Sequence, residues 1–167
     1  TVNYTIVTDI VFAGSKAVRN VYGNSNSNRL VQLGPVNLSS VTNPKLKFAH
    51  IAETEGGWDH CYVEISIDGG TTWTILPASA YAGSGLYTVP SYNTPEGPCF
   101  TEDSYTAWDT PSTVDNTWWR TEKFNLSAYI GQSSVMIRFR LKSDSSGIRA
   151  GWFLDAIQIY DELCSEP

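Results

Sequence analysis

The sequence predicts an all-β fold in which two antiparallel sheets stack on each other. Apolar and polar side chains alternate with a period of two through most of the chain, for example over residues 61–67. This alternation is typical of strands with one buried face. Between two such runs, Asp68-Gly69-Gly70 is a strong hairpin signal, because glycine accepts positive φ. No stretch has the periodicity of an amphipathic helix of normal length.

The predicted strands follow one another along the chain, separated by turn residues. In chain order they are 4–12, 17–22, 29–33, a run around 45–48, 61–68, 71–75, 135–142 and 152–160. Residues 126–130 are expected to form one short turn. About eight to ten strands, each with one buried face, imply two layers of sheet.

A long segment between the predicted strands has a different composition. Residues 77–117, the insertion, hold five of the eight prolines: Pro77, Pro90, Pro95, Pro98 and Pro111. So long an irregular segment in a compact domain is usually either functional or disordered. The sequence therefore predicts one domain over 1–160 that carries this insertion, with 161–167 as the start of a linker.

Composition excludes several classes of partner. The net charge is −6 and the charged fraction only 17%, so the basic footprint that nucleic acid requires is missing. No apolar run of about 18 residues could span a membrane. A surface rich in Ser, Thr, Asn and Gln is common in extracellular β proteins, and we expect a secreted or cell-surface protein whose export signal, if it has one, lies upstream of Thr1.

The three cysteines give no metal motif. Cys61, Cys99 and Cys164 are widely spaced and form no C-x-x-C pair, which argues against a zinc ribbon or a thioredoxin-like motif. One disulfide, with three candidate pairings, and three reduced thiols both remain open.

Familiar catalytic motifs are also missing. The two histidines, His50 and His60, form no H-E-x-x-H pattern, and neither a G-x-S-x-G elbow nor a phosphate-binding glycine loop occurs. Glu53 and Glu55 are the nearest candidates for a glycosidase carboxylate pair. The sequence predicts a protein that is not an enzyme.

Strand phase suggests a cation site. Asp155 falls in phase with the apolar residues of 153–159, and Asp59 is in phase with the apolar face of 61–67. A buried carboxylate needs a cation, an arginine or several N–H donors. Together with Glu53 and Glu55 in the preceding loop, the two aspartates would suit structural Ca²⁺, which binds oxygen ligands.

The alternative for Asp155 is that it caps a turn or pairs with Arg149 or His50. A bulge near Gly151 would reverse the phase and remove the argument.

Aromatic residues in or beside the loops are the candidate ligand-binding groups. Sugar rings have apolar faces that stack on aromatic rings, and protein interfaces also favour Tyr and Trp. The candidates are Trp108, Tyr105 and Tyr92 first, with Trp118 and Trp58. The alternative is that the long loops fold back and use many of their aromatic residues as a core of their own.

One strand also has a basic polar face. Arg138, Arg140 and Lys142 alternate with apolar residues, and Glu64 is a candidate partner opposite them. Cross-strand charge pairing is the simplest interpretation. Recruitment of a ligand is the alternative.

Three segments carry a resemblance to a known family. They are 57–73 (GWDHCYVEISIDGGTTW), 137–144 (IRFRLKSD) and 151–157 (GWFLDAI), with a weaker echo at 13–18. Together they resemble the MAM-like jelly-roll domains of secreted bacterial proteins. Such domains occur behind immune inhibitor A-type metalloproteases and as the cleaved adhesin domains of gingipains.

The resemblance implies a galactose-binding-like jelly roll, often with a structural calcium near the aspartates matched here by Asp59 and Asp155. Where the family often has a second acid in the last strand, this chain has Ala156. That departure implies a site of lower charge, one completed by backbone carbonyls, or an empty site.

The function expected from the sequence is that of a non-catalytic accessory module that binds a polysaccharide, glycan or other surface ligand for a larger secreted protein. The alternative is a structural domain that packs against neighbouring domains of the parent protein, such as a protease or adhesin module.

Overall fold

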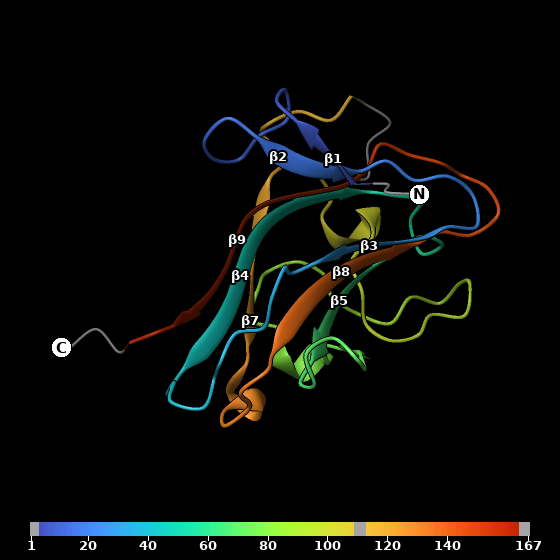
Figure 1. Cartoon of the computed structure of the whole chain (residues 1–167). Helices are drawn as coiled ribbons and strands as arrows, with labels where there is room; N and C mark the ends of the chain where they lie inside the picture. Colours follow the sequence, from blue (N-terminus) through green and yellow to red (C-terminus); the bar gives the residue numbers. More distant parts are fainter. Residues whose placement is uncertain (1–3, 109–112, 164–167) are drawn as a thin grey trace.

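The structure is a computed structural model and describes residues 4–108 and 113–163. Within these ranges nine strands form two antiparallel sheets that lie face to face (Figure 1). The five-stranded sheet has the order β1 (Tyr4–Val7), β2 (Ala17–Asn20), β9 (Gly151–Asp161), β4 (Pro44–Glu53) and β7 (Arg120–Asn125). The four-stranded sheet has the order β3 (Ser27–Val31), β8 (Met136–Lys142), β5 (His60–Ser66) and β6 (Thr74–Ile75).

Strands β2 to β9 form two sets of four, β2-β9-β4-β7 and β3-β8-β5-β6, and β1 adds to the first set beside β2. From β2 to β9, consecutive strands alternate between the two sheets except for the β5–β6 hairpin, as in an eight-stranded jelly roll. The predicted fold class, an all-β two-sheet sandwich, is confirmed. No helix in the described ranges is long and apolar enough to cross a membrane.

Aromatic side chains from both sheets fill the space between them. The ring of Phe48 in β4 lies 5.0 Å from that of Phe139 in β8 and 6.2 Å from that of Phe124 in β7. Trp152 in β9 packs edge-on against Phe139 at 5.6 Å. Stacked and edge-to-face contacts of this kind add to the free energy gained by burying apolar area.

The predicted hairpin after β5 is present, with a shorter return strand than expected. Asp68 accepts hydrogen bonds from the backbone N–H groups of Thr71 (3.0 Å) and Thr72 (2.9 Å). Gly69 and Gly70 both have positive φ, 70° and 94°. Because Asp68 engages the first N–H groups of the return segment, strand pairing begins only at β6.

The last strand contains a bulge that the alternation of its sequence does not reveal. Ala156 has φ 49°, and the register between β4 and β9 shifts at this point. Before the bulge, Trp152 and Leu154 face the core; beyond it, Ile157 and Ile159 line a space between the sheets. The prediction that Asp155 shares a face with Ile157 and Ile159 is therefore wrong, because the bulge inserts one residue between them.

The alternation of apolar residues did not predict strand β7, because Glu122 occupies the inward-facing position two residues before Phe124. This carboxylate has no exposed surface. It accepts hydrogen bonds from His50 Nε2 at 3.1 Å, from the Tyr105 hydroxyl at 2.6 Å and from the Tyr81 hydroxyl at 2.5 Å. Three donors replace the water that the carboxylate loses on burial.

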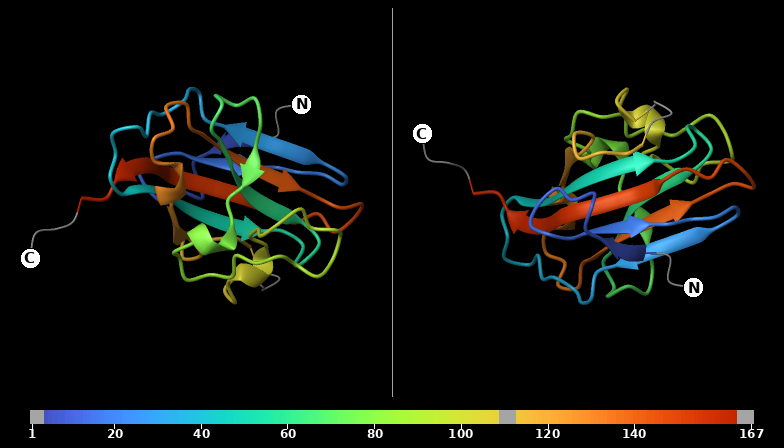
Figure 2. Two further views of the ribbon diagram at one scale, coloured as in Figure 1. Left: turned by 90° about the horizontal axis from the view of Figure 1, so that it is seen from below. Right: turned by 90° about the horizontal axis from the view of Figure 1, so that it is seen from above.

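Two 3₁₀ turns, η1 (Ala78–Ala80) and η2 (Glu102–Ser104), lie in the insertion, and a third, η3 (Ser127–Tyr129), lies within the turn expected at 126–130. The insertion, green to yellow in Figure 2, is gathered along one side of the sandwich in both views. Phe100 pairs with Cys61 of β5 through an isolated bridge, and Tyr81 pairs with Phe124 of β7. These bridges attach the insertion to both sheets.

Two of the three cysteines can be placed. Cys61 and Cys99 are buried and are not bonded to each other, and burial raises the pKa of each thiol. Cys164 lies outside the described residues, so pairings that involve it stay open.

Candidate functional site

The aromatic candidates divide into buried and exposed groups. Trp108 has no exposed surface, and its indole Nε1–H donates to the carbonyl of Trp118 at 2.9 Å. Trp118 is itself buried. Tyr105 packs edge-on against Trp108 at 4.7 Å and donates its hydroxyl proton to Glu122. Trp108 and Tyr105 therefore pack inside the insertion, with Trp118 just after its end, and Trp108 has no surface with which to contact a ligand.

Trp58 and Tyr92 form an exposed pair, the aromatic platform. Trp58 is 41% exposed and Tyr92 56%. Their rings lie nearly parallel, 12° apart in plane, with centroids separated by 5.0 Å. Asn93 donates a hydrogen bond to the Trp58 carbonyl at 2.9 Å, and the Trp58 N–H donates to the Glu55 carbonyl at 3.1 Å. The backbone on both sides of Trp58 is thus fixed.

A glycine permits this stacking. Gly57 has φ +70°, and a Cβ placed on it would lie 3.0 Å from the Tyr92 ring. Any other residue would meet both an unfavourable backbone conformation and the ring of Tyr92.

A polar hollow of about 560 Å³ opens beside the platform. Hydroxyl, amide, ammonium and carboxylate groups line it together with the Trp58 ring. The lining residues are Ser25, Asn26, Ser27, Trp58, Asn93, Lys142, Ser143, Asp144 and Ser145. An aromatic wall with a few convergent polar groups is typical of sites that orient a small polar ligand.

Hydrogen bonds hold the walls of the hollow in place. The Ser143 hydroxyl donates to the Gly23 carbonyl at 2.6 Å and accepts from the Asn26 N–H at 3.0 Å. Lys142 Nζ lies 2.8 Å from Glu96 Oε1. The loop between β2 and β3 is therefore tied to the start of the loop that follows β8.

Below the hollow lies an acidic cluster of Glu55, Asp59 and Asp144. One carboxylate oxygen from each lies within 4.8 Å of the others. Asp59 is completely buried; its Oδ1 accepts from the Asp144 N–H at 2.9 Å. Within the described ranges, Asp59 Oδ2 and Glu55 Oε2 are buried and lie within hydrogen-bond geometry of no donor, although the Tyr22 hydroxyl is close enough to Asp59 to lower its pKa. Such orphaned oxygens are unusual, since buried polar atoms nearly always have a partner.

Burial raises the pKa of Asp59, against the opposing effects of the Tyr22 hydroxyl and the Asp144 N–H. Burial also raises the pKa of Glu55, and the neighbouring charges of Asp144 and Asp59 add to the increase. A cation placed among the three carboxylates would reverse both shifts.

Of the four residues that the sequence analysis grouped as a calcium site, Asp59 and Glu55 lie in this cluster, and Glu53 and Asp155 do not. Glu53 accepts a hydrogen bond from the Ala150 N–H. Asp155 Oδ2 accepts from the N–H groups of Phe12 at 2.9 Å and Ala13 at 3.0 Å, on the outer side of the five-stranded sheet. Asp155 thus caps a loop, the alternative that the sequence had left open.

The sequence did not single out Asp144. Its position follows from the register of β5 and β8. The first residue of β5, His60, pairs with the last residue of β8, Lys142, so Asp59 before β5 and Asp144 after β8 lie close together. That register could not be read from one strand alone.

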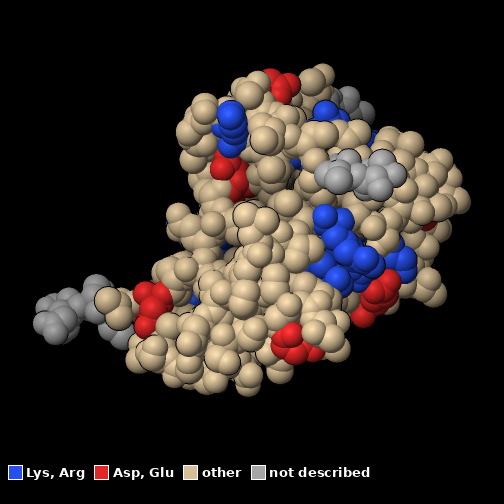
Figure 3. All heavy atoms as spheres, in the orientation of Figure 1, with Lys and Arg blue, Asp and Glu red and all other residues tan. Residues whose placement is uncertain are grey.

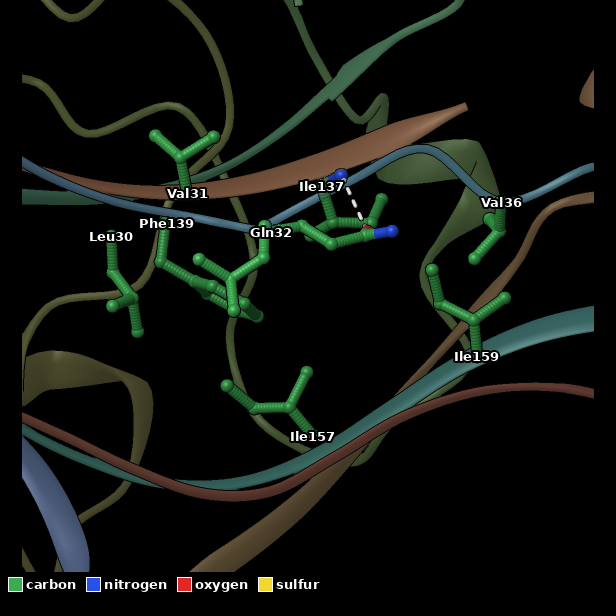
Figure 4. Close-up of a pocket in the computed structure, with 9 residues that line it drawn as sticks. Leu30, Val31, Gln32, Val36, Ile137, Phe139, Ile157 and Ile159 are labelled. Carbon is green, nitrogen blue, oxygen red and sulfur yellow. Dashed lines mark hydrogen bonds between the residues drawn. The ribbon is translucent and has the colours of Figure 1, made fainter. Parts of the chain in front are cut away.

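A second space lies between the sheets, away from the platform. This apolar groove of about 380 Å³ is shown in Figure 4 and is lined by Leu30, Val31, Gln32, Leu33, Val36, Ile137, Phe139, Ile157 and Ile159. Gln32 is its one polar side chain, and its Oε1 already accepts from the Ile137 N–H at 3.2 Å. The groove therefore suits an apolar partner rather than a sugar.

Comparison with known proteins does not assign a family. No protein-family model matches the chain, and no curated protein matches it. Among solved structures, the K2 cleaved adhesin domain of Lys-gingipain is 17% identical with a TM-score of 0.49, over 95% of this chain and 90% of that one.

The glycoside hydrolase domain of Endo-D from Streptococcus pneumoniae R6 is 16% identical with a TM-score of 0.46. It covers all of this chain, which spans only 21% of that longer chain. At these identities and TM-scores neither structure assigns an activity or a ligand to this chain.

Proposed function

We propose that this chain is a non-catalytic accessory module of an extracellular protein and that it binds a glycan at the polar hollow. The observation that carries the proposal is the exposed stacked pair of Trp58 and Tyr92 beside a hollow lined with hydroxyl and amide groups. The flat face of Trp58 would contact the C–H face of a sugar ring, while serine and asparagine side chains would hydrogen-bond its hydroxyls.

The side chains most suited to catalysis are engaged elsewhere, which supports a binding role. His50 lies in the buried network with Glu122. His60 is buried, with ring contacts to the Tyr62 hydroxyl at 2.9 Å and the Gly57 carbonyl at 3.2 Å. Burial lowers the pKa of both imidazoles and raises that of the Cys61 and Cys99 thiols, so none of these four groups is presented to a substrate.

We further infer that the acidic cluster holds a structural Ca²⁺. Glu55, Asp59 and Asp144 offer only oxygen ligands, which Ca²⁺ prefers. The carboxylate oxygens of Glu55 and Asp59 that accept no hydrogen bond would be the ligands of such an ion. Because Trp58 lies between two of these residues, such an ion would stabilise the turn that presents the platform. Extracellular modules commonly have calcium sites of modest affinity, which fits a secreted or cell-surface location.

The glycan proposal is tested by affinity electrophoresis of the whole chain through gels that contain single polysaccharides. The wild-type chain should be retarded by at least one polymer, and Trp58→Ala should migrate without retardation. Phe12→Ala is the matched control, because Phe12 is exposed to a similar extent, 47%, but packs against Trp119 on another part of the surface. Equal retardation of wild type and Trp58→Ala on every polymer, or none at all, would exclude the proposal.

The apolar groove favours a second function, packing against a neighbouring module. Beyond the bulge, residues 158–161 of β9 pair with β4 on one side, and no described strand pairs with the other side. An open strand edge beside apolar side chains can accept an extended segment. If the groove is such a surface, Ile157→Asp in the parent protein should weaken attachment of the neighbouring module, measured by limited proteolysis of their junction.

A further inference from the structure

The outer face of the four-stranded sheet has an excess of positive charge, although the chain as a whole is acidic. Arg29 in β3 and Arg138, Arg140 and Lys142 in β8 form a basic stripe there; Arg29 lies directly opposite Arg140 in the register. In Figure 3, lysine and arginine side chains gather over β3 and β8, with acidic side chains beside them.

Two carboxylates neutralise only part of the stripe. Glu64 accepts from Arg140 Nε at 2.9 Å and also from Arg138. Glu96 accepts from Arg140 Nη2 at 2.6 Å and from Lys142 Nζ at 2.8 Å. Four positive charges thus face two negative ones, which leaves two in excess.

Arg29 in β3 is the cation of the stripe that neither carboxylate contacts. Arg138 and Arg140 are further covered by aromatic rings, Trp73 at 4.4 Å and Tyr62 at 4.5 Å from their guanidinium carbons. Arg29, by contrast, is exposed and has no ion-pair partner in the part of the chain that the structure describes. Arg140, directly opposite Arg29, is already neutralised by Glu64 and Glu96, so the charge that an anion would neutralise is that of Arg29.

This excess charge adjoins the polar hollow. Ser27, two residues before Arg29 on the same strand, lines the hollow and pairs with Lys142, which lines it too. Two residues of a strand span about 7 Å. A chain of sugars with one unit on the platform can therefore continue along β3 past Lys142 and Arg29.

We propose that the glycan bound at this site is anionic, with carboxylate or sulfate groups that pair with Arg29 and Lys142. This inference rests on the proposed function and adds the charge of the ligand to it. An arginine on an edge strand also prevents edge-to-edge association of sheets, and the experiment below separates the two roles.

The test compares polymers that differ in charge. Isothermal titration measures binding of the whole chain to oligogalacturonate, to its methyl ester, which keeps the sugar and loses the charge, and to a sulfated galactan oligosaccharide. We expect oligogalacturonate or the sulfated galactan to bind at least about fivefold more tightly than the methyl ester, and this preference to shrink at high salt. Which of the two binds better identifies the anionic group.

Variants assign the charge contact. Arg29→Gln should weaken binding of the anionic oligosaccharide about threefold or more and leave binding of the methyl ester unchanged. Lys47→Gln, an exposed cation on β4 in the other sheet, is the control and should change neither. If the neutral ester binds as tightly as the acid and Arg29→Gln has no effect, the anionic inference is overturned while glycan binding stands. If no glycan binds, both are overturned.

Discussion

Trp58 and Tyr92 lie face to face with ring centroids 5.0 Å apart, although one follows β4 and the other belongs to the insertion. Their contact joins the insertion to the end of the sandwich where the polar hollow and the acidic cluster meet. Trp58 and Tyr92 are exposed, whereas Trp108 and Trp152 are completely buried, so the rings that a ligand can reach and the rings of the core can be changed separately.

Substitution of the two tryptophans should have opposite consequences. Trp58→Ala removes a half-exposed ring, so we expect at least about tenfold weaker glycan binding with little change in stability. Trp108→Ala leaves a cavity in the core of the insertion and should lower the free energy of unfolding by about 3–5 kcal/mol. Urea denaturation and titration of each variant separate these effects. Loss of stability in Trp58→Ala with binding retained would contradict the assignment.

Calcium should raise the melting temperature. At about a hundredfold excess over Kd, an ion that binds only the folded chain adds about 2.7 kcal/mol, or about 5–10 °C in Tm for a domain of this size. EGTA should reverse the increase, and Asp59→Asn should abolish the response. Asp155→Asn is the control: it loses the cap on Phe12 and Ala13 and melts earlier, yet should keep its response to calcium. Identical melting curves in calcium and EGTA would remove the metal hypothesis.

The pH dependence without calcium follows from the raised pKa of Asp59. The folded chain binds this proton more tightly than the unfolded chain does. The stabilising contribution is therefore fully present below the ordinary carboxyl pKa near 3.8 and is lost as the pH rises through the folded value. In EGTA, wild type should lose stability relative to Asp59→Asn as the pH rises toward 7. Parallel pH profiles of the two chains would show that folding does not raise the pKa of Asp59.

The buried pair of Glu122 and His50 should be essential for stability. The His50 Nδ1 accepts from the Trp152 indole at 3.1 Å, so its proton resides on Nε2 and is donated to Glu122. Burial lowers the pKa of His50. Burial opposes ionisation of Glu122, but the hydrogen bonds that Glu122 accepts lower its pKa overall. A neutral imidazole therefore faces an ionised carboxylate.

Glu122→Ala should therefore destabilise the chain by about 3–5 kcal/mol. Glu122→Gln, which leaves one donor without an acceptor, should cost about 1–3 kcal/mol. Both values come from chemical denaturation. A change below about 0.5 kcal/mol for Glu122→Ala, the range of ordinary surface substitutions, would contradict the role given to this network.

The period-two pattern predicted the sandwich because one face of most strands is buried against the other sheet. It failed where a polar group was buried or the backbone bulged. Glu122 occupies an inward position of β7, which hid that strand, and Ala156 inserts a residue into β9, which reversed the phase for Asp155. A buried glutamate and a bulge at an alanine leave no distinctive pattern in the sequence of their own strand, so neither can be recognised from that strand alone.

The site was only partly predictable. Trp58, Tyr92 and Asp59 were recognised from residue type and strand phase, whereas Trp108 and Trp118 have the same chemistry but are buried. Exposure of an aromatic residue in a long insertion depends on how the loop folds back, which local sequence does not determine. Asp144 joins the cluster through the register of β5 and β8, a long-range pairing.

The most direct test of the account follows the indole N–H resonances of the six tryptophans by NMR during a glycan titration. The signal that disappears in Trp58→Ala identifies Trp58. The account predicts that this resonance shifts in a saturable way with ligand while those of the buried Trp108 and Trp152 stay in place. An unmoved Trp58 signal, with shifts confined to another tryptophan, would place the ligand elsewhere and contradict the central claim.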